Sequence, residues 1–293
     1  MFTIAIPSHH RSSTIGTHTL RMLDAHSIPH SVIKIFVAPE EVAIYRSIIP
    51  EDIEIIEGRL GCIENRAAIR DHFPADQNIV YMDDDLKALY SVCDLTPDHA
   101  TCQCYNKKNV GTPTYTKQIP LPDLNQFLTE AFQTMRKEGA HLGGIYPICN
   151  GYFATHRYTT TLNYICGFMY LEINQKDIQL RGDQYAEDFE RSCAFFARDG
   201  KIVRFEYVMA KSNFYTGEGG LVESRTVERT RIAQEKLAAM YPDYLVVKPP
   251  TKGNKYWNLK IKKQPAPSAT LGTQSTASVA LGPPQHTPHD DQQ

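Results

Sequence analysis

Four short apolar runs alternate with three helical patterns at the start of this 293-residue chain. The runs predict strands at Thr3–Ile6, Ser31–Val37, Ile53–Glu57 and Ile79–Met82. The segments between them predict helices at Gly16–Ala25, Glu40–Ile48 and Cys62–His72. Strands separated by helices of this length pair in parallel as βαβ units. The pattern therefore predicts an α/β fold with helices on both faces of a sheet.

The rest of the chain is expected to complete one domain and then to end in a tail. Further helices are predicted at Leu124–Glu138, Asp183–Arg198 and Val222–Met240, and further strands at His141–Pro147, Tyr164–Ile173 and Ile202–Met209. Residues 1–95 and 123–263 are the two halves of the domain, and 96–122 is a loop or insertion between them. Residues 264–293 have almost no large apolar side chains, which predicts a disordered tail.

Composition and charge exclude several classes of protein. A formal net charge of -2 gives no global attraction to nucleic acid or membranes. No apolar run is long enough to cross a bilayer. The N-terminus reads as a strand, because it lacks the basic segment and the cleavage site of a signal peptide. The 7 cysteines then indicate reduced thiols and a cytoplasmic protein.

Three consecutive aspartates, Asp83–Asp85, follow the fourth predicted strand. Such a concentration of charge is costly unless a cation or water neutralises it. Side chains alternate along a strand, so Asp83 and Asp85 are expected to point together and away from Asp84. Two carboxylates at this spacing suit Mg²⁺ or Mn²⁺ together with a substrate phosphate. An acidic turn or a helix N-terminus explains the same residues without a metal.

Several motifs follow one another in a fixed order. They are Pro7-Ser8-His9-His10-Arg11, Glu64-Asn65-Arg66, Asp83–Asp85, Glu187-Asp188 and Gly217-Glu218-Gly219-Gly220. This order, over residues 1–221, resembles the GT-A nucleotide-sugar glycosyltransferases. The resemblance implies a Rossmann-like, mixed and mostly parallel sheet flanked by helices, in a single domain over residues 1–263. The nucleotide sugar would bind to residues 1–95, and residues 123–263 would hold the acceptor and the catalytic group.

The resemblance also implies a role for each motif. Asp83 and Asp85 would hold Mn²⁺ or Mg²⁺ against the diphosphate of the donor, expected to be a UDP-hexose. Asp188 would act as the general base of an inverting transfer, with Glu187 as its competitor. The residues expected to bind the nucleotide sugar are Pro7, Ser8, Arg11, Arg66, Asp83, Asp84, Gly217, Gly219 and Gly220.

Each of these residues also has a plainer explanation. Arg66 could be an ordinary surface arginine on its helix. Glu187 and Asp188 could be the acids that favour any helix N-terminus, and the glycines a simple turn. Many GT-A enzymes have a late His as a further metal ligand, but no His lies between His156 and His286. That ligand is absent here or is replaced by Asn213, Glu218 or water.

Within the superfamily, the later part of the chain looks closest to the TET-associated glycosyltransferases of phages, other viruses and eukaryotes. Glu187–Arg191, Gly200–Phe205 and the glycine-rich loop carry this likeness. It implies a hydroxymethylated pyrimidine in DNA as acceptor and, for a viral protein, the host-cell cytoplasm. The basic stretch Lys248–Lys263 contains Tyr256 and Trp257 and no acidic residue, which suits DNA. A basic terminal strand with one packed Trp explains it equally well.

Three other functions stay open. The chain could be a GT-A enzyme acting on glycan or protein, or a nonenzymatic module that binds nucleotides or nucleic acid. Loss of residues such as Asp85 and Asp188 is expected in the nonenzymatic case, and both are present. Tyr81-Met82-Asp83-Asp84 is also the palm signature of reverse transcriptases. A polymerase needs another Asp on an upstream strand, and the earlier aspartates lie in predicted helices or loops.

Overall fold

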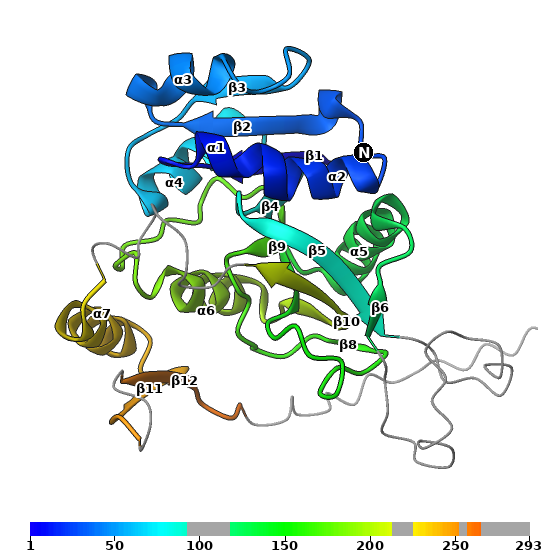
Figure 1. Ribbon diagram of the computed structural model, residues 1–293. Coiled ribbons are helices and arrows are strands. Elements are labelled where there is room, and N and C mark those ends of the chain that lie inside the picture. The colour runs from blue at the N-terminus through cyan, green and yellow to red at the C-terminus, as the bar shows by residue number, and fades with distance from the viewer. Residues whose placement is uncertain (93–117, 213–224, 252–256, 265–293) are drawn as a thin grey trace, which may run out of the picture.

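The computed structural model describes residues 1–92, 118–212, 225–251 and 257–264 (Figure 1). A ten-stranded sheet has the order β3-β2-β1-β4-β9-β7-β10-β5-β6, and β8 pairs with β10. Its first four strands pair in parallel, as the alternating pattern predicted. They are β1 (Thr3–Pro7), β2 (Ile33–Val37), β3 (Glu54–Glu57) and β4 (Asn78–Met82).

The second half of the chain adds strands of both directions to the same sheet. β9 (Met169–Ile173) runs antiparallel between β4 and β7 (Leu142–Tyr146), and β10 (Val203–Ser212) is parallel to β7. Antiparallel strands complete the sheet beyond β10: β5 (Leu86–Val92), β6 (Gln118–Pro120) and β8 (Tyr158–Thr159). The predicted α/β class, with one mixed and mostly parallel sheet, is confirmed.

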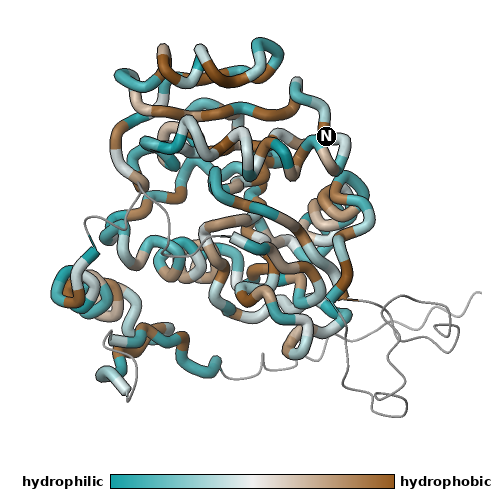
Figure 2. Tube along the Cα trace, viewed as in Figure 1, coloured by the Kyte–Doolittle hydropathy of each residue, from teal (hydrophilic) through white to brown (hydrophobic). Residues whose placement is uncertain are grey.

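Alternate side chains of the strands build two cores, one on each face of the sheet. Ile4 and Ile6 of β1 face one core, and Ala5 faces the other. The first core is covered by α1 (Ser12–Ile15), the π-helical turn η1 (Gly16–Leu20), α2 (Arg21–Ala25), α3 (Val42–Arg46) and α5 (Leu124–Glu138). The second is covered by α4 (Cys62–His72) and α6 (Glu187–Asp199). In Figure 2, β2 is accordingly brown, hence hydrophobic, over most of its length.

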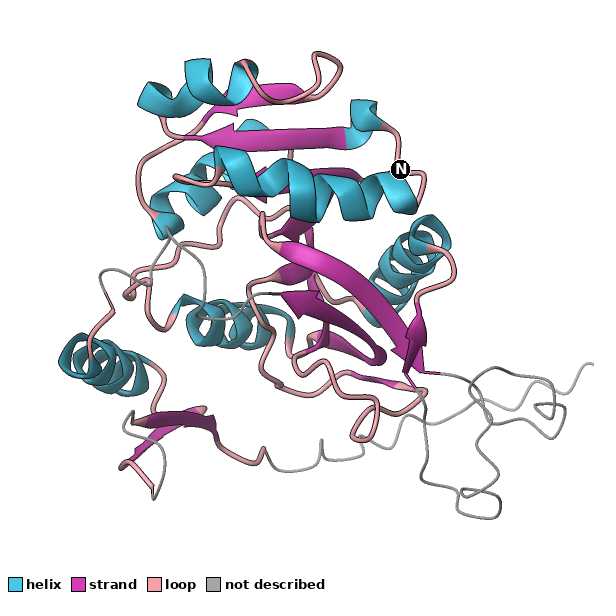
Figure 3. Cartoon of the chain, viewed as in Figure 1, coloured by secondary structure: helices cyan, strands magenta, loops and turns pink. Residues whose placement is uncertain are grey.

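The remaining elements are short or peripheral. Two 3₁₀ turns, η2 (His30–Val32) and η3 (Pro39–Glu41), flank β2. Leu237 of α7 (Val227–Met240) packs with buried leucines of the antiparallel hairpin β11 (Leu245–Lys248) and β12 (Asn258–Ile261), apart from the sheet (Figure 3). Within the residues that the structure describes, no helix has the length and apolar character needed to cross a membrane.

Some predictions about the second half were wrong. No element was predicted for residues 86–95, yet residues 86–92 form β5, and residues 118–120 of the expected loop form β6. The strand expected from Tyr164 begins only at Met169, because the preceding residues leave the sheet and contact α6, where the Ile165 amide donates to Ser192 Oγ (3.1 Å). Residues 93–117 and the tail beyond residue 264 lie outside the described part of the chain.

Candidate active site

The turns that follow β1 and β4 lie side by side at the carboxyl end of the parallel strands. Asp84 joins them, since its carboxylate accepts hydrogen bonds from Ser8 Oγ (2.5 Å) and from Arg11 Nη1 (2.8 Å). Pro7 ends β1 and leads into this turn, and the Ser8 hydroxyl also meets the Tyr45 hydroxyl (2.7 Å). Burial raises the pKa of Asp84, and Arg11 partly offsets that effect. Asp84 therefore holds the first turn in place.

The three aspartates form a turn, since β4 ends at Met82. The strand alternation expected for them therefore does not apply. Asp85 lies 3.4 Å from Arg11 through Oδ2, while its Oδ1 is buried and has no hydrogen-bond partner in the described structure. The Asp83 side chain is 35% exposed and accepts a hydrogen bond from Arg66 Nη2 (3.2 Å). Desolvation raises the pKa of Asp83 to about 7 against the lowering effect of Arg66, and the neighbouring aspartates add to the rise.

These two carboxylates fit a hard divalent cation. Asp85 has a buried carboxylate oxygen without a hydrogen-bond donor, and Asp83 has a carboxyl with a raised pKa. A nearby positive charge would stabilise the ionised form of both. Among the described residues, no third His, Cys, Asp or Glu completes a close three-ligand group with them. Mg²⁺ commonly binds through one or two carboxylates and completes its shell with water and substrate phosphates. The donor set therefore suits a cation that is delivered or shared with a diphosphate.

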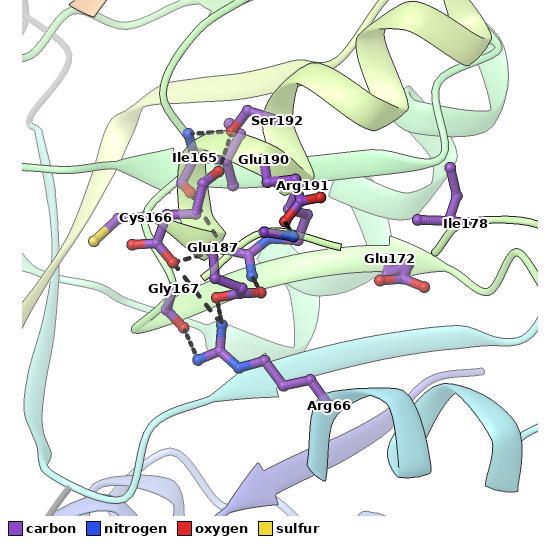
Figure 4. Close-up of polar contacts among 12 residues, drawn as sticks. Arg66, Ile165, Cys166, Gly167, Glu172, Ile178, Glu187, Glu190, Arg191 and Ser192 are labelled. Carbon is purple, nitrogen blue, oxygen red and sulfur yellow. Dashed lines mark hydrogen bonds and ion pairs between the residues drawn. The ribbon is translucent and has the colours of Figure 1, made fainter. Parts of the chain in front are cut away.

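Arg66 joins the aspartate turn to the start of α6. It is buried, not the surface arginine of the plainer explanation. Its Nη1 donates to Glu187 (2.7 Å) and its Nη2 donates to the Gly167 carbonyl (3.3 Å) (Figure 4). Nη1 also lies 3.9 Å from Asp188, and Nη2 also donates to Asp83. One guanidinium thus contacts a carboxylate from each of the two predicted acidic motifs.

Glu187 and Asp188 open α6 but occupy different environments. Glu187 is buried between Arg66 and Arg191, and these two cations hold the pKa of its carboxyl well below its ordinary range despite burial. Asp188 has a side chain 28% exposed. Its Oδ2 accepts from the Tyr164 hydroxyl (2.8 Å), and its Oδ1 accepts from Arg191 Nη2 (3.2 Å). Of this pair, Asp188 is the carboxylate that a bound molecule can reach.

The sequence reasoning missed the groups that support this site. Arg191 is fully buried, with its guanidinium 3.7 Å from the centre of the Tyr170 ring, and Tyr170 stacks on Tyr81 at 4.4 Å. Arg70 and Glu172 form a second buried pair through two hydrogen bonds, of 2.8 and 3.1 Å. The Glu187–Arg191 pair has the i, i+4 spacing that is readable on a helix. The aromatic stack depends on the pairing of β4 with β9 and has no local signal.

Other predicted site residues lie elsewhere or outside the described chain. Gly217, Gly219 and Gly220 fall in the segment 213–224, which is not described, and so do the candidate ligands Asn213 and Glu218. The described part of the basic stretch lies in and beside the β11–β12 hairpin, with exposed Lys248 and Lys260 and a part-buried Trp257. Residues 252–256 of that stretch are also outside the description.

Comparisons with known proteins give a likeness in structure and none in sequence. No protein-family model matches the sequence, and no curated protein matches it. Among solved structures, the chain is similar to that of S. aureus TarS 1-349, at 10% sequence identity and a TM-score of 0.38. The likeness covers 71% of this chain and 59% of that chain, so it spans less than two thirds of the matched structure.

Proposed function

We propose that the chain is a glycosyltransferase of the GT-A type that transfers the sugar of a UDP-sugar to a hydroxyl group. The observation that carries this proposal is the position of Arg66 between Asp83 and the Glu187–Asp188 pair. A diphosphate donor needs a group that binds a cation, and an acceptor hydroxyl needs a base. The buried guanidinium of Arg66 holds the candidates for these two roles, Asp83 and Asp188, next to each other. The order of motifs along the sequence supports the same assignment.

Three side chains would do the chemistry. Asp83 and Asp85 would hold Mg²⁺ or Mn²⁺, which stabilises the charge that develops on a departing diphosphate. Asp188 accepts the proton of the acceptor hydroxyl, whose oxygen bonds to the anomeric carbon as the bond from that carbon to the diphosphate breaks. Attack from the face opposite the leaving group inverts the anomeric centre. Tyr164 and Arg191 keep the Asp188 carboxylate oriented through hydrogen bonds to its two oxygens.

Asp84, Ser8 and Arg11 would shape the donor side of the site. Ser8 and Arg11 share the Asp84 carboxylate, so the turn after β1 is fixed against the turn after β4. The Arg11 guanidinium also lies within 3.4 Å of Asp85, at the expected diphosphate position. In this arrangement Pro7 and Ser8 bound the nucleotide, and Arg11 contributes positive charge near its phosphates.

For the acceptor we propose DNA that carries 5-hydroxymethylpyrimidine. Lysines supply affinity for phosphates, and exposed Lys248 and Lys260 belong to the described part of the basic stretch. The resemblance of the Glu187–Arg191 region to the TET-associated enzymes supports the same acceptor. A glycan or protein acceptor would leave the donor chemistry unchanged.

The test measures donor cleavage and transfer separately. Wild-type enzyme is incubated with Mn²⁺, a panel of UDP-sugars and, in separate reactions, hydroxymethylated DNA or a glycan, and free UDP and the mass of the acceptor are measured. Asp85→Asn and Asp188→Asn should each lower transfer by at least about 100-fold, as expected for loss of a charge-stabilising or proton-accepting group. Asp71→Asn, at an exposed surface pair with Arg59, is the matched control. Full activity in Asp85→Asn rejects the metal assignment, and sugar transfer only to a glycan rejects the DNA acceptor.

A further inference from the structure

Two imidazoles and a buried carboxylate meet in the turn after β1. His9 Nδ1 lies 2.6 Å from Glu41 Oε2, and the backbone amide of His10 donates to Glu41 Oε1 (2.7 Å). The rings of His9 and His10 stack with their centroids 3.8 Å apart. Within the described chain, this is the group in which three candidate ligand atoms lie within 4.8 Å of one another.

We propose that His9, His10 and Glu41 bind a borderline divalent cation, with Zn²⁺ as the preferred ion. Two imidazole nitrogens and one carboxylate oxygen form a donor set typical of zinc, with a fourth position left for water. Asp83 and Asp85 offer only oxygen, which suits Mg²⁺ or Mn²⁺ instead. The two sites therefore have different chemistry, and the zinc site stands independently of the proposed transferase activity.

The ligand groups must rearrange locally to accept the ion. Metal–ligand bonds of about 2.0–2.2 Å at tetrahedral angles place ligand atoms roughly 3.3–3.5 Å apart. The His9–Glu41 contact must therefore open by somewhat less than about 1 Å, and the proton shared in it is released. His10 is exposed and the His9 side chain is 39% exposed, so their rings can turn in solvent.

The carboxylate is already oriented for this role. The Glu41 side chain is only 6% exposed, and the His10 amide fixes its Oε1 and thereby the direction of Oε2. His10 adopts a left-handed backbone conformation (φ 56°), and its ring lies against that of His9. A bound ion would tie η3 to the turn that contains Ser8 and Arg11. Zinc would then stabilise the same turn that Asp84 holds.

The full chain is titrated with Zn²⁺ by calorimetry and with Co²⁺ by absorption spectroscopy, and its melting temperature is recorded with and without Zn²⁺. We expect one Zn²⁺ per chain with micromolar or tighter affinity, a raised melting temperature and a cobalt spectrum without thiolate charge transfer. His10→Ala, at an exposed position, and Glu41→Gln should each weaken binding by at least about 10-fold. His30→Ala, which removes a surface imidazole paired with Asp24 and Asp52, and Asp85→Asn should leave it unchanged.

Several results would overturn the site. These are no Zn²⁺ binding up to about 100 μM, binding that persists in a His9→Ala/His10→Ala double variant, binding lost in His30→Ala, or a cobalt–thiolate band. If Glu41→Gln fails to fold, the His10→Ala titration alone decides, since that side chain is outside the core.

Discussion

The hydroxyl of Thr19 donates a 2.7 Å hydrogen bond to the backbone carbonyl of Asp83. The same oxygen accepts a 2.9 Å hydrogen bond from the amide of Leu86, so Thr19 spans the whole aspartate turn. Thr19 is fully buried and belongs to the π-helical turn η1, a helix irregularity that is frequent at functional sites. The irregular helix thus places one hydroxyl where it fixes both ends of the turn.

Replacing Thr19 by Val should loosen this turn. Val keeps the shape of the side chain but leaves the buried amide of Leu86 without a partner, which costs about 1–3 kcal/mol. We expect a lower free energy of unfolding and, because Asp83 and Asp85 are less well positioned, at least about 10-fold weaker Mn²⁺ binding. Urea unfolding and Mn²⁺ titration measure the two effects. Thr19→Ser should restore Mn²⁺ affinity, because it keeps the hydroxyl.

Thr129 offers a matched control for Thr19. Its hydroxyl also donates to a backbone carbonyl, that of Asn125, but on an exposed surface of α5. Thr129→Val should change stability by less than about 0.5 kcal/mol and leave Mn²⁺ binding intact. Equal Mn²⁺ affinity in Thr19→Val and wild type would show that the hydroxyl does not position the aspartates.

Neutralising Glu187 should mainly lower stability, whereas neutralising Asp188 should mainly lower the rate of transfer. Glu187→Gln leaves Arg66 and Arg191 as two buried cations with one fewer anion, and breaking such an ion pair costs about 3–5 kcal/mol. Asp188→Asn keeps one acceptor oxygen for Arg191, and its amide NH2 can donate to the Tyr164 hydroxyl; the side chain is partly exposed, so stability should change little. Transfer should nevertheless fall by about 100-fold or more in Asp188→Asn. Urea unfolding together with initial rates separates the two; a stable, inactive Glu187→Gln would reverse the roles.

The first half of the fold is predictable because its strands are unbroken apolar runs. Val80 and the residues around it are buried on both faces of the sheet, so hydrophobicity alone marks β4. β5 is not predictable in this way. Lys87 is exposed on it and Ser91 interrupts its apolar pattern, and its partner β10 lies far away in the sequence. Its pairing depends on tertiary contacts that no local pattern records.

Individual residues of the candidate site are predictable, but their contacts are not. Asp83 and Asp188 stand out as charges next to predicted elements, yet 121 residues separate Arg66 from Glu187. The salt bridge between them requires α4 and α6 to cover the same face of the sheet. The residue pattern of α4 cannot distinguish that arrangement from one in which Arg66 faces solvent. Asp84 was likewise recognisable as a member of the nucleotide-binding group with Ser8 and Arg11, but its individual hydrogen bonds to them were not.

The raised pKa of Asp83, about 7, predicts how metal binding depends on pH. The folded protein holds this proton more tightly than the unfolded chain does, so ionisation destabilises the fold as pH rises through about 7. A divalent cation favours the ionised form. Mn²⁺ affinity should therefore fall by up to about tenfold per pH unit below pH 7 and level off above it. Mn²⁺ titrations from pH 5.5 to 8.5 measure this dependence.

Asp83→Asn provides the comparison for the pH series. Without metal, the gain in thermal stability of this variant over wild type should be largest at pH 8, where Asp83 is ionised in the folded protein, and smaller at pH 5, where it is ionised only in the unfolded chain. A wild-type Mn²⁺ affinity that is flat between pH 5.5 and 7 would mean that Asp83 does not bind the ion as an ionising ligand.

Tyr170 should contribute to stability through its ring and not through its hydroxyl. The hydroxyl is buried and has no hydrogen-bond partner among the described residues, whereas the ring contacts Arg191 and Tyr81. Tyr170→Phe should be neutral or stabilising, because an unpaired buried polar group is removed. Tyr170→Leu loses both ring contacts and should destabilise by about 2–4 kcal/mol. Thermal and urea unfolding test this order; a Phe variant as unstable as the Leu variant would reveal a hydrogen bond of the hydroxyl.

Gly167 should not tolerate even one added methyl group. A Cβ there would lie 2.5 Å from Asp188 Oδ1, closer than real Cβ atoms approach, and 3.0 Å from Arg66 Nη1, which is a tight contact. In Gly167→Ala the carboxylate must move away from its present position, so we expect transfer to fall by at least about 10-fold. Gly16→Ala is the control, because its Cβ would meet no atom within 4 Å and its helical backbone favours Ala. Initial rates and melting temperatures of both variants are measured. Undiminished transfer in a folded Gly167→Ala would remove Asp188 from the reaction, since no working base could be displaced without loss of rate.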